Sequence, residues 1–196
     1  MPIADELVDP LALFNADRSA AFAAKDPMAA LCSVATIDAQ GHPCVRTLVL
    51  RDLEGQLALF VNASSPKWNA LQEQFSIMTY WPSQQIQYRF MVSGDPIPHE
   101  IVAQSWDLRP AAPKRMDWFY EQMATQSTPI ADRDTLLAQL DALELNEPLN
   151  APSNARGLAL NPVSVERLDL TQENGVHDRV LFARVDEHWE QRVLVP

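Results

Sequence analysis

Three strand-like segments in the first third of the chain are joined by turns that are too short to contain a helix. The segments run from Leu31 to Ile37, from Cys44 to Arg51 and from Gln56 to Asn62, and each connecting turn contains a glycine. Parallel neighbours need a crossover of a dozen or more residues, whereas antiparallel neighbours need only a few. The short turns therefore predict an antiparallel meander, in which glycine supplies the positive φ of a tight turn.

The rest of the chain alternates between helical and strand-like stretches. Asp9-Pro10 is typical of a helix start and predicts a helix to about Ala24. Further helices are expected at 67–74, 98–108, 113–123 and 132–145, and further strands at 75–81, 85–93, 157–170 and 177–186, with a short final strand. Strands first, helices inserted and strands last imply an α+β domain around an antiparallel barrel.

The length of 196 residues favours one domain with a full hydrophobic core. Within this single domain, 1–196, we expect residues 1–28 to form an N-terminal helical segment and residues 98–147 to form a helical insertion. The proline-rich stretch from Pro148 to Pro152 is interpreted as a loop rather than a domain boundary.

Composition narrows the classes of partner and compartment. Twenty-six acidic residues against fifteen basic ones give a net charge of −11, which disfavours nucleic acid because phosphate contacts need a basic stripe. No apolar run approaches membrane-spanning length, and the first residues lack the pattern of a secretion signal. Two cysteines, Cys32 and Cys44, without such a signal favour a reducing cytoplasm.

Several cationic residues occupy positions that suit an anion. Strand alternation places Arg46 and Arg51 on opposite faces of one strand; they either hold a ligand or are strand-end arginines that reach solvent. Ser64 to Lys67 follows a strand and opens a helix, which suits a phosphate but is also common as an ordinary helix cap. Arg89 lies among apolar residues, so it either pairs with a carboxylate or faces a ligand.

Near the C-terminus, His177, Asp178 and Arg179 combine an acid–base group with a cation. The four histidines lack metal-ligand spacing, so no metal site is expected. A nucleophile elbow, a Walker loop and a GxGxxG motif are all absent. None of the five glycines lies close to another, which excludes a dinucleotide-binding Rossmann crossover.

Taken in order, these segments resemble the pyridoxamine 5′-phosphate oxidase family, whose members have an FMN-binding split barrel. The likeness covers about residues 29 to 196. The matching elements are Ala35 to Ile37 with the Gly41-His42-Pro43 turn, Arg46 to Arg51, Phe60-Val61-Asn62, Ser65-Pro66-Lys67, Trp81, Gly94, Arg109-Pro110, Trp118, Gln126-Ser127, and His177-Asp178-Arg179 with the closing Leu194-Val195-Pro196. The resemblance implies an antiparallel split β-barrel with peripheral helices, and a homodimer with the flavin site at its interface.

The resemblance also implies a set of site residues. Arg46 and Lys67 would bind the FMN phosphate, and Gln126-Ser127 and Arg179 would contact FMN from the partner subunit. The implied FMN-binding residues are Arg46, Thr47, Leu48, Val49, Leu50, Arg51, Phe60, Val61, Ser65, Lys67, Arg89, Gln126, Ser127 and Arg179. Arg51, Arg109 and His177 are the candidate substrate-binding residues, and Arg51 and His177 are the catalytic candidates.

The departures from the family pattern fall mainly on the substrate side. The family's Arg-Gln and its tryptophan are replaced by Tyr88-Arg89 and Leu168, and the phosphate-binding arginine before the lysine by Pro66. In the substrate clamp, Ser105, Pro113 and Gly175 stand where the family has tyrosine, serine and arginine, and only Arg109 remains. Each lost charge-assisted hydrogen bond contributes about 1.5–3 kcal/mol. Pyridoxamine phosphate is therefore expected to bind weakly unless Arg51 and Arg115 compensate.

Two main hypotheses follow. The first is an FMN-dependent oxidoreductase that acts on a small molecule with a CH–NH2 or similar donor, with a substrate other than pyridoxamine phosphate. The alternative is a non-catalytic flavin-binding or storage module, which the missing clamp motivates. A third hypothesis, a tetrapyrrole-binding split barrel, would need an axial ligand such as His177 or His42.

Overall fold

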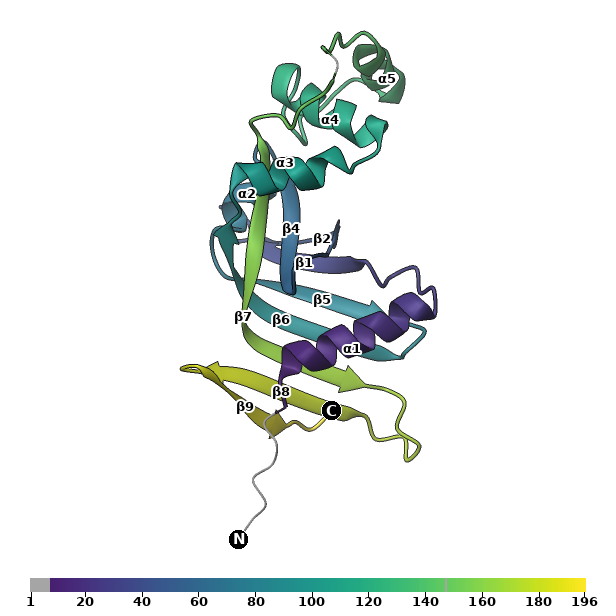
Figure 1. Cartoon of the computed structure of the whole chain (residues 1–196), viewed down its shortest axis with the longest axis vertical. Helices are drawn as coiled ribbons and strands as arrows, with labels where there is room; N and C mark the ends of the chain where they lie inside the picture. The colour runs from purple at the N-terminus through teal and green to yellow at the C-terminus, as the bar shows by residue number, and fades with distance from the viewer. Residues whose placement is uncertain (1–7, 147) are drawn as a thin grey trace.

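The computed structural model describes residues 8–146 and 148–196 (Figure 1). Its helices are α1 (Pro10–Ala23), α2 (Lys67–Ala70), α3 (His99–Asp107), α4 (Ala111–Gln122) and α5 (Arg133–Asp141). Its strands are β1 (Leu31–Ile37), β2 (Pro43–Val49), β3 (Arg51–Leu53), β4 (Gln56–Asn62), β5 (Phe75–Trp81), β6 (Ile86–Pro96), β7 (Ala155–Asp169), β8 (Asp178–Val185) and β9 (His188–Val193). The predicted α+β class, with an antiparallel split barrel and peripheral helices, is confirmed.

The strands form one curled antiparallel sheet in the order β2-β1-β5-β6-β7-β4-β3. The long strand β7 runs down the molecule in Figure 1 and pairs with β4 through its first residues and with β8 through its last. Strand β9 pairs with β8. The C-terminal strands therefore return to the sheet begun by β1, as the sequence predicts.

The predicted meander is wrong at one place, because β4 pairs with β3 and β7 rather than with β2. The segment expected to be one strand to Arg51 breaks at Leu50, whose side chain is 2% exposed and lies in the core. The Leu50 N–H donates to the Ala30 carbonyl, and its own carbonyl accepts from Arg18 Nη2 at 2.6 Å. The chain thus crosses from one edge of the sheet to the other within a single residue.

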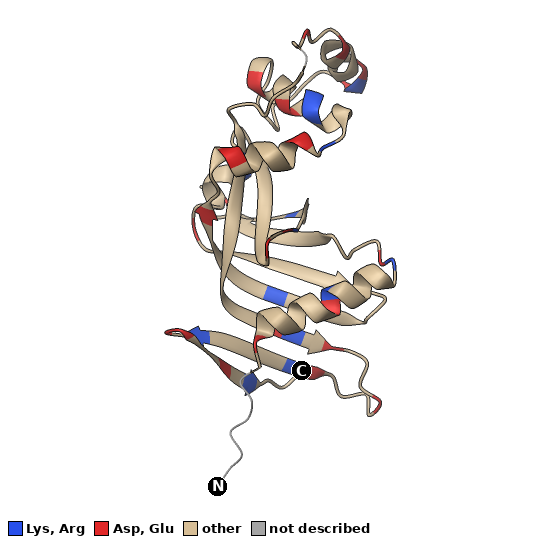
Figure 2. Ribbon diagram, viewed as in Figure 1, with Lys and Arg blue, Asp and Glu red and all other residues tan. Residues whose placement is uncertain are grey.

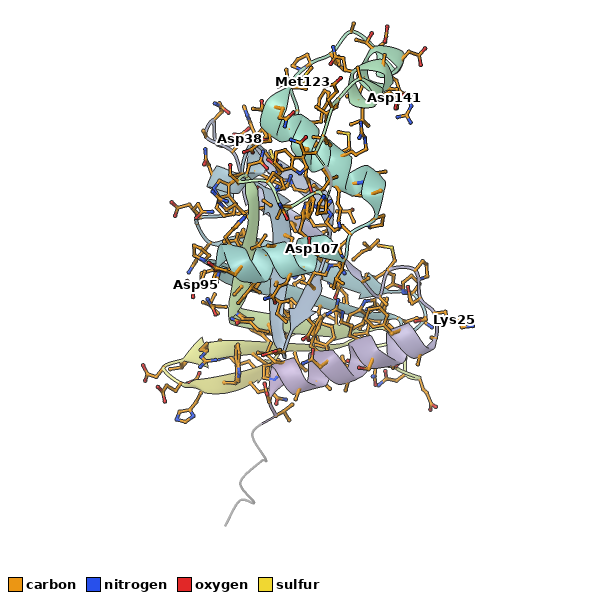
Figure 3. All side chains as sticks on the ribbon, turned by 45° about the horizontal axis from the view of Figure 1, so that its top comes forward. Lys25, Asp38, Asp95, Asp107, Met123 and Asp141 are labelled. Atoms are coloured by element: carbon orange, nitrogen blue, oxygen red, sulfur yellow. The ribbon has the colours of Figure 1, made fainter. Side chains whose placement is uncertain are left out.

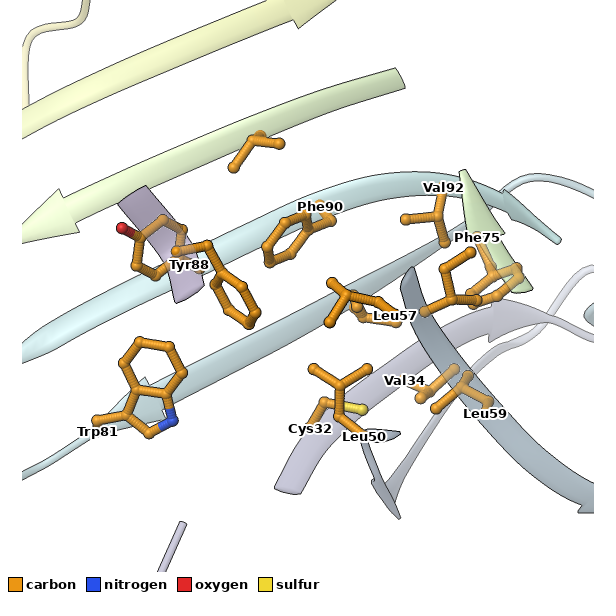
Figure 4. Close-up of a cluster of buried hydrophobic side chains, with 14 of the residues drawn as sticks. Cys32, Val34, Leu50, Leu57, Leu59, Phe75, Trp81, Tyr88, Phe90 and Val92 are labelled. Atoms are coloured by element: carbon orange, nitrogen blue, oxygen red, sulfur yellow. The ribbon is translucent and has the colours of Figure 1, made fainter. Parts of the chain in front are cut away.

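One face of the sheet is covered by α1 and holds the hydrophobic core (Figures 1 and 4). Phe14 of α1 is fully buried and makes edge-to-face contacts with Tyr88 and Phe90. Asp17 fixes the same helix to the sheet, because its Oδ2 accepts from Tyr88 Oη at 2.6 Å and from Arg167 Nε at 2.9 Å. The alternating apolar residues of β5 and β6 therefore bury one face and leave the other open.

Helices α3, α4 and α5 lie together beyond one end of the sheet (Figure 1). Acidic residues are spread over helices and turns in Figure 2, whereas the strands carry mostly uncharged residues interrupted by arginines on β6, β7 and β8. No helix in the described part of the chain is both long and apolar enough to cross a membrane. The predicted α2 is shorter than expected, since it ends at Ala70.

Cys32 and Cys44 are both free thiols. They lie on paired strands, but Cys32 is opposite Leu48 and Cys44 is opposite Thr36, so the two are several rows apart. Burial raises the pKa of the Cys32 thiol to about 12, which makes it unreactive.

Candidate functional site

A cavity of about 270 Å³ lies where α3 and α4 approach β2, β4 and the start of β7. Figure 3 draws the surrounding side chains, with Asp107 at the end of α3 and Met123 just after α4. The lining residues are Thr47, Leu48, Val49, Arg51, Phe60, Val61, Val102, Ser105, Trp106, Arg109, Asp117, Ala155 and Arg156. Seven of these lining residues belong to the set expected from sequence, namely Thr47, Leu48, Val49, Arg51, Phe60, Val61 and Arg109.

Two cations that do not line the cavity lie near each other: Arg46 on β2, next to the lining residue Thr47, and Lys67 at the start of α2. Lys67 Nζ donates to Ser65 Oγ at 2.7 Å and to Gln126 Oε1 at 3.0 Å, and Arg46 Nη1 donates to Thr36 Oγ1 at 2.7 Å. Burial lowers the pKa of Lys67, and the positive charge of Arg46 lowers it further. Neither cation pairs with a carboxylate anywhere in residues 8–146 and 148–196. This pair is therefore an uncompensated positive centre in an acidic protein.

Arg109, the surviving arginine of the expected substrate clamp, is held by a carboxylate. Its Nη1 donates to Asp117 Oδ2 at 2.6 Å, and Trp106 Nε1 donates to the same oxygen at 2.8 Å. Asp117 is 6% exposed. Burial raises the pKa of Asp117, although Arg109 and the indole N–H oppose the shift. Arg109 thus lines the cavity with its charge already balanced.

A second polar cluster lies on the open face of the sheet. Glu166 of β7 accepts from Arg89 Nη2 at 2.5 Å and from Arg179 Nε at 3.0 Å. Burial would raise the pKa of Glu166, but the hydrogen bonds from both arginines outweigh it and hold that pKa below its usual value. Of the two alternatives for Arg89, pairing with a carboxylate is the one observed.

Comparisons with known proteins show which proteins this chain is similar to in sequence and fold. No protein-family model matches the chain. PhzG from Burkholderia lata, solved with tetrahydrophenazine-1-carboxylic acid, shares the fold with a TM-score of 0.83 at 21% identity, covering 98% of this chain and 95% of that one. A pyridoxamine 5′-phosphate oxidase-related, FMN binding protein from Nostoc punctiforme has a TM-score of 0.77 at 22% identity, with coverage of 96% and 99%.

Curated relatives agree with the structural neighbours. The pyridoxine/pyridoxamine 5′-phosphate oxidase of Pseudoalteromonas atlantica is 28% identical over 197 residues, which is 97% of this chain and 90% of that protein. That of Chromobacterium violaceum is 29% identical over 198 residues, with coverage of 98% and 91%. Over almost its full length the chain is similar to pyridoxine/pyridoxamine 5′-phosphate oxidases, and these relatives and neighbours support a divergent member of that family.

Some residues expected from this family do not lie at the cavity. Leu50 is buried in the core, and both its backbone N–H and its carbonyl are already hydrogen-bonded. Ser127 is exposed in the loop after α4 with a φ of 73°, and the side chain of its neighbour Gln126 accepts from Lys67 Nζ at 3.0 Å. His177 is exposed just before β8.

Two further candidates have structural partners instead. Arg115 Nη2 donates to the carbonyls of Leu140 and Leu143, so it caps the end of α5 and does not compensate for the lost clamp. His42 lies in the β1–β2 turn beside Asp38, with 74% of its side chain exposed, and it lines none of the cavity described above. The geometry of His42 offers no support for an axial ligand.

Sequence reasoning missed the roles of three residues. Asp117 and Trp106 shape the cavity, and Glu166 is the charge partner of Arg89 and Arg179. Asp117 follows Arg109 by eight positions with two prolines between them, a spacing with no recognised motif. Glu166 belongs to the alternation of β7, and its pairing with Arg89 depends on the β6–β7 register, in which the two residues are opposite each other. Only knowledge of that register would have singled Glu166 out.

Proposed function

We propose that this protein is an FMN-dependent oxidoreductase whose flavin phosphate is bound by Arg46 and Lys67. The observation that carries the proposal is the pair of close cations without a carboxylate partner among the described residues, in a protein of net charge −11. A phosphate dianion would offset both charges and would accept charge-assisted hydrogen bonds. The hydroxyl of Ser65, already bound to Lys67, completes a donor set suited to that group.

The cavity next to this pair suits the rest of such a cofactor. Leu48, Phe60 and Val61 supply apolar walls for a planar ring system, and Arg51 supplies a cation. The Arg51 side chain makes no hydrogen bond or ion pair with the residues that the structure describes, so its guanidinium remains free to stabilise negative charge on a bound group. The chemistry that bound FMN supplies is acceptance of a hydride from a CH–NH2 or similar donor.

The known proteins support the cofactor more directly than the substrate. The Nostoc punctiforme neighbour is described as FMN binding, and the curated relatives are oxidases of pyridoxine and pyridoxamine phosphate. In this chain Arg109 is charge-balanced and Arg115 caps a helix. The substrate is therefore proposed to be a small molecule other than pyridoxamine phosphate.

A second copy of the chain is part of the proposal. Arg89 and Arg179 lie on the open sheet face and line none of the cavity that Arg51 lines, while His177 is exposed next to that face. If these residues contribute to a flavin site, a partner subunit must bring them to it. We propose a homodimer with each flavin bound where the two copies meet.

The double variant Arg46→Ala with Lys67→Ala tests the cofactor proposal. Losing two charge-assisted contacts should weaken FMN binding by at least about 100-fold, since each contributes roughly 1.5–3 kcal/mol. FMN per protein is measured from the visible spectrum and by mass after heat release. The matched control, Lys25→Asn with Arg133→Ala, removes two surface charges and should retain the flavin. Unchanged stoichiometry in the site variant would contradict the proposal.

Reduction of the bound flavin distinguishes the hypothesis of an oxidoreductase from that of a flavin-storage module. An oxidoreductase should show bleaching of the flavin absorption with some amine or alcohol donor, followed by reoxidation in air. A flavin that no amine, alcohol or reduced nicotinamide reduces would favour the non-catalytic module. Pyridoxamine phosphate should give slow or no turnover.

A further inference from the structure

Asp117 is a buried carboxylate placed against the cavity that the proposed function assigns to substrate and flavin. It is 6% exposed and lines the cavity, and one of its oxygens accepts from both Trp106 and Arg109. No hydrogen bond to the other oxygen, Oδ1, is recorded within residues 8–146 and 148–196. This arrangement fixes a negative charge at the wall of the cavity.

The arginines that line the cavity differ in how free they are to bind a ligand. Arg109 is balanced by Asp117, and Arg156 Nη1 donates to the carbonyls of Ser153 and Ala155. Arg51 is the lining cation that has no partner among the described residues. A ligand therefore meets the unpartnered guanidinium of Arg51, the guanidinium of Arg156 held only by backbone carbonyls, and an Arg109–Asp117 pair with no net charge.

Charge repulsion from Asp117 grows in proportion to the charge of the ligand. A phosphate dianion near Arg109 meets twice the repulsion from Asp117 that a monoanion meets, which offsets its doubled attraction to Arg109, and Nη1 of Arg109 is already occupied by Asp117. The remaining walls are apolar and aromatic, with Phe60, Val102 and Trp106 among them. Such walls suit a ring that carries a single compact charge.

We propose that Asp117 is a specificity residue that makes this cavity accept a singly charged aromatic carboxylate and reject an aromatic phosphate monoester. The inference rests on the proposed function, because it assigns the substrate class of that site. Asp117 acts through Arg109, by withholding the guanidinium from phosphate, and through direct repulsion. The carboxylate of the substrate pairs with Arg51.

The test compares benzoate with phenyl phosphate, two probes that share one ring and differ in charge. Each is titrated by calorimetry at pH 8, where the phosphate monoester is a dianion, into the purified full-length protein. Wild-type protein should bind benzoate at least about fivefold more tightly than phenyl phosphate. Tighter binding of phenyl phosphate by wild type would overturn the proposal without any variant.

Asp117→Asn is the informative variant, because asparagine keeps the volume and an acceptor for the Trp106 N–H while removing the charge. Phenyl phosphate affinity should rise at least about tenfold, while benzoate affinity changes by less than about threefold. The gain should disappear when Arg109→Met is added. Asp107→Asn, which removes an exposed carboxylate from the end of α3, should change neither affinity.

An unchanged ratio of the two affinities in Asp117→Asn would refute the role of Asp117. The flavin content of each sample is measured separately by absorption. Absence of flavin would refute the cofactor proposal, whereas the affinity ratio decides the role of Asp117 whether or not flavin is bound. The two failures are therefore distinguishable.

Discussion

At the scale of single residues, Glu166 fixes the positions of the Arg89 and Arg179 side chains. One carboxylate with 10% of its side chain exposed accepts hydrogen bonds from both guanidinium groups. The cluster keeps a net positive charge of one and orients both arginines along the open sheet face. Glu166 is thus a positioning residue for two of the expected flavin contacts.

Glu166→Gln should destabilise the protein by roughly 1–2 kcal/mol at pH 7, a reduced value because Arg89 is half exposed. The pKa of Glu166 is depressed in the folded state, so its contribution is fully present above the ordinary glutamate pKa and is lost as pH falls through the folded pKa. The difference between wild type and variant in urea unfolding should therefore shrink below about pH 4. Glu190→Gln, which breaks the exposed pair with Arg192, should cost less than about 0.5 kcal/mol at any pH. A gap that persists at pH 3 would contradict this assignment.

At the scale of elements, Arg18 links α1 to the break between β2 and β3. Its side chain is buried, and it donates to the carbonyls of Ala29 and Leu50 at 3.1 and 2.6 Å. Leu50 is the crossing residue itself, and Ala29 lies just before β1, next to the Ala30 carbonyl that accepts from the Leu50 N–H. The helix therefore holds the strand break in place as well as covering the core.

Arg18→Met should lower the free energy of unfolding by about 2–4 kcal/mol, because methionine fills the same space but leaves two buried carbonyls without a donor. Urea unfolding followed by circular dichroism measures the loss. Arg133→Met, at the exposed start of α5, serves as the control and should change stability by less than about 0.5 kcal/mol. Equal stabilities of the two variants would show that the arginine does not hold the break.

Most elements were predictable because their patterns are local. The alternation from Leu31 to Ile37 and the Asp9-Pro10 start gave their elements correctly. The break at Leu50 was not predictable, since an apolar residue continues the strand pattern while its backbone changes partners. In the site, the lining by Arg51 and Phe60 followed from the family resemblance, whereas the pairing of Arg109 with Asp117 arises only from the packing of α3 on α4.

At the scale of the whole molecule, the open sheet face is the surface that a second copy would cover. The row through Val45, Ala35, Ser76, Met91 and Ser164 consists of small or apolar side chains on paired strands. Val45 is 70% exposed and Met91 is 39% exposed. The arginines held by Glu166 border the same row. Dimerisation through this face would therefore also complete the proposed flavin site.

The variant Val45→Asp with Met91→Asp should therefore turn the proposed dimer into a monomer and reduce flavin content together. Light scattering coupled to size-exclusion chromatography gives the mass, and absorption gives the flavin. Leu137→Asp, on an exposed position of α5, should leave both unchanged. A wild-type protein that is monomeric yet saturated with flavin would exclude the shared site.

The crossing at Leu50 has a consequence for how the barrel can open. Edge strands β2 and β3 are successive parts of one backbone, so the seam of the barrel is closed by a peptide bond and not by a removable ladder of hydrogen bonds. If that seam widens, residues 46–51 must move with it, and four of these residues line the cavity. Transient opening of the barrel and dissociation of a ligand from this cavity should therefore occur at the same rate.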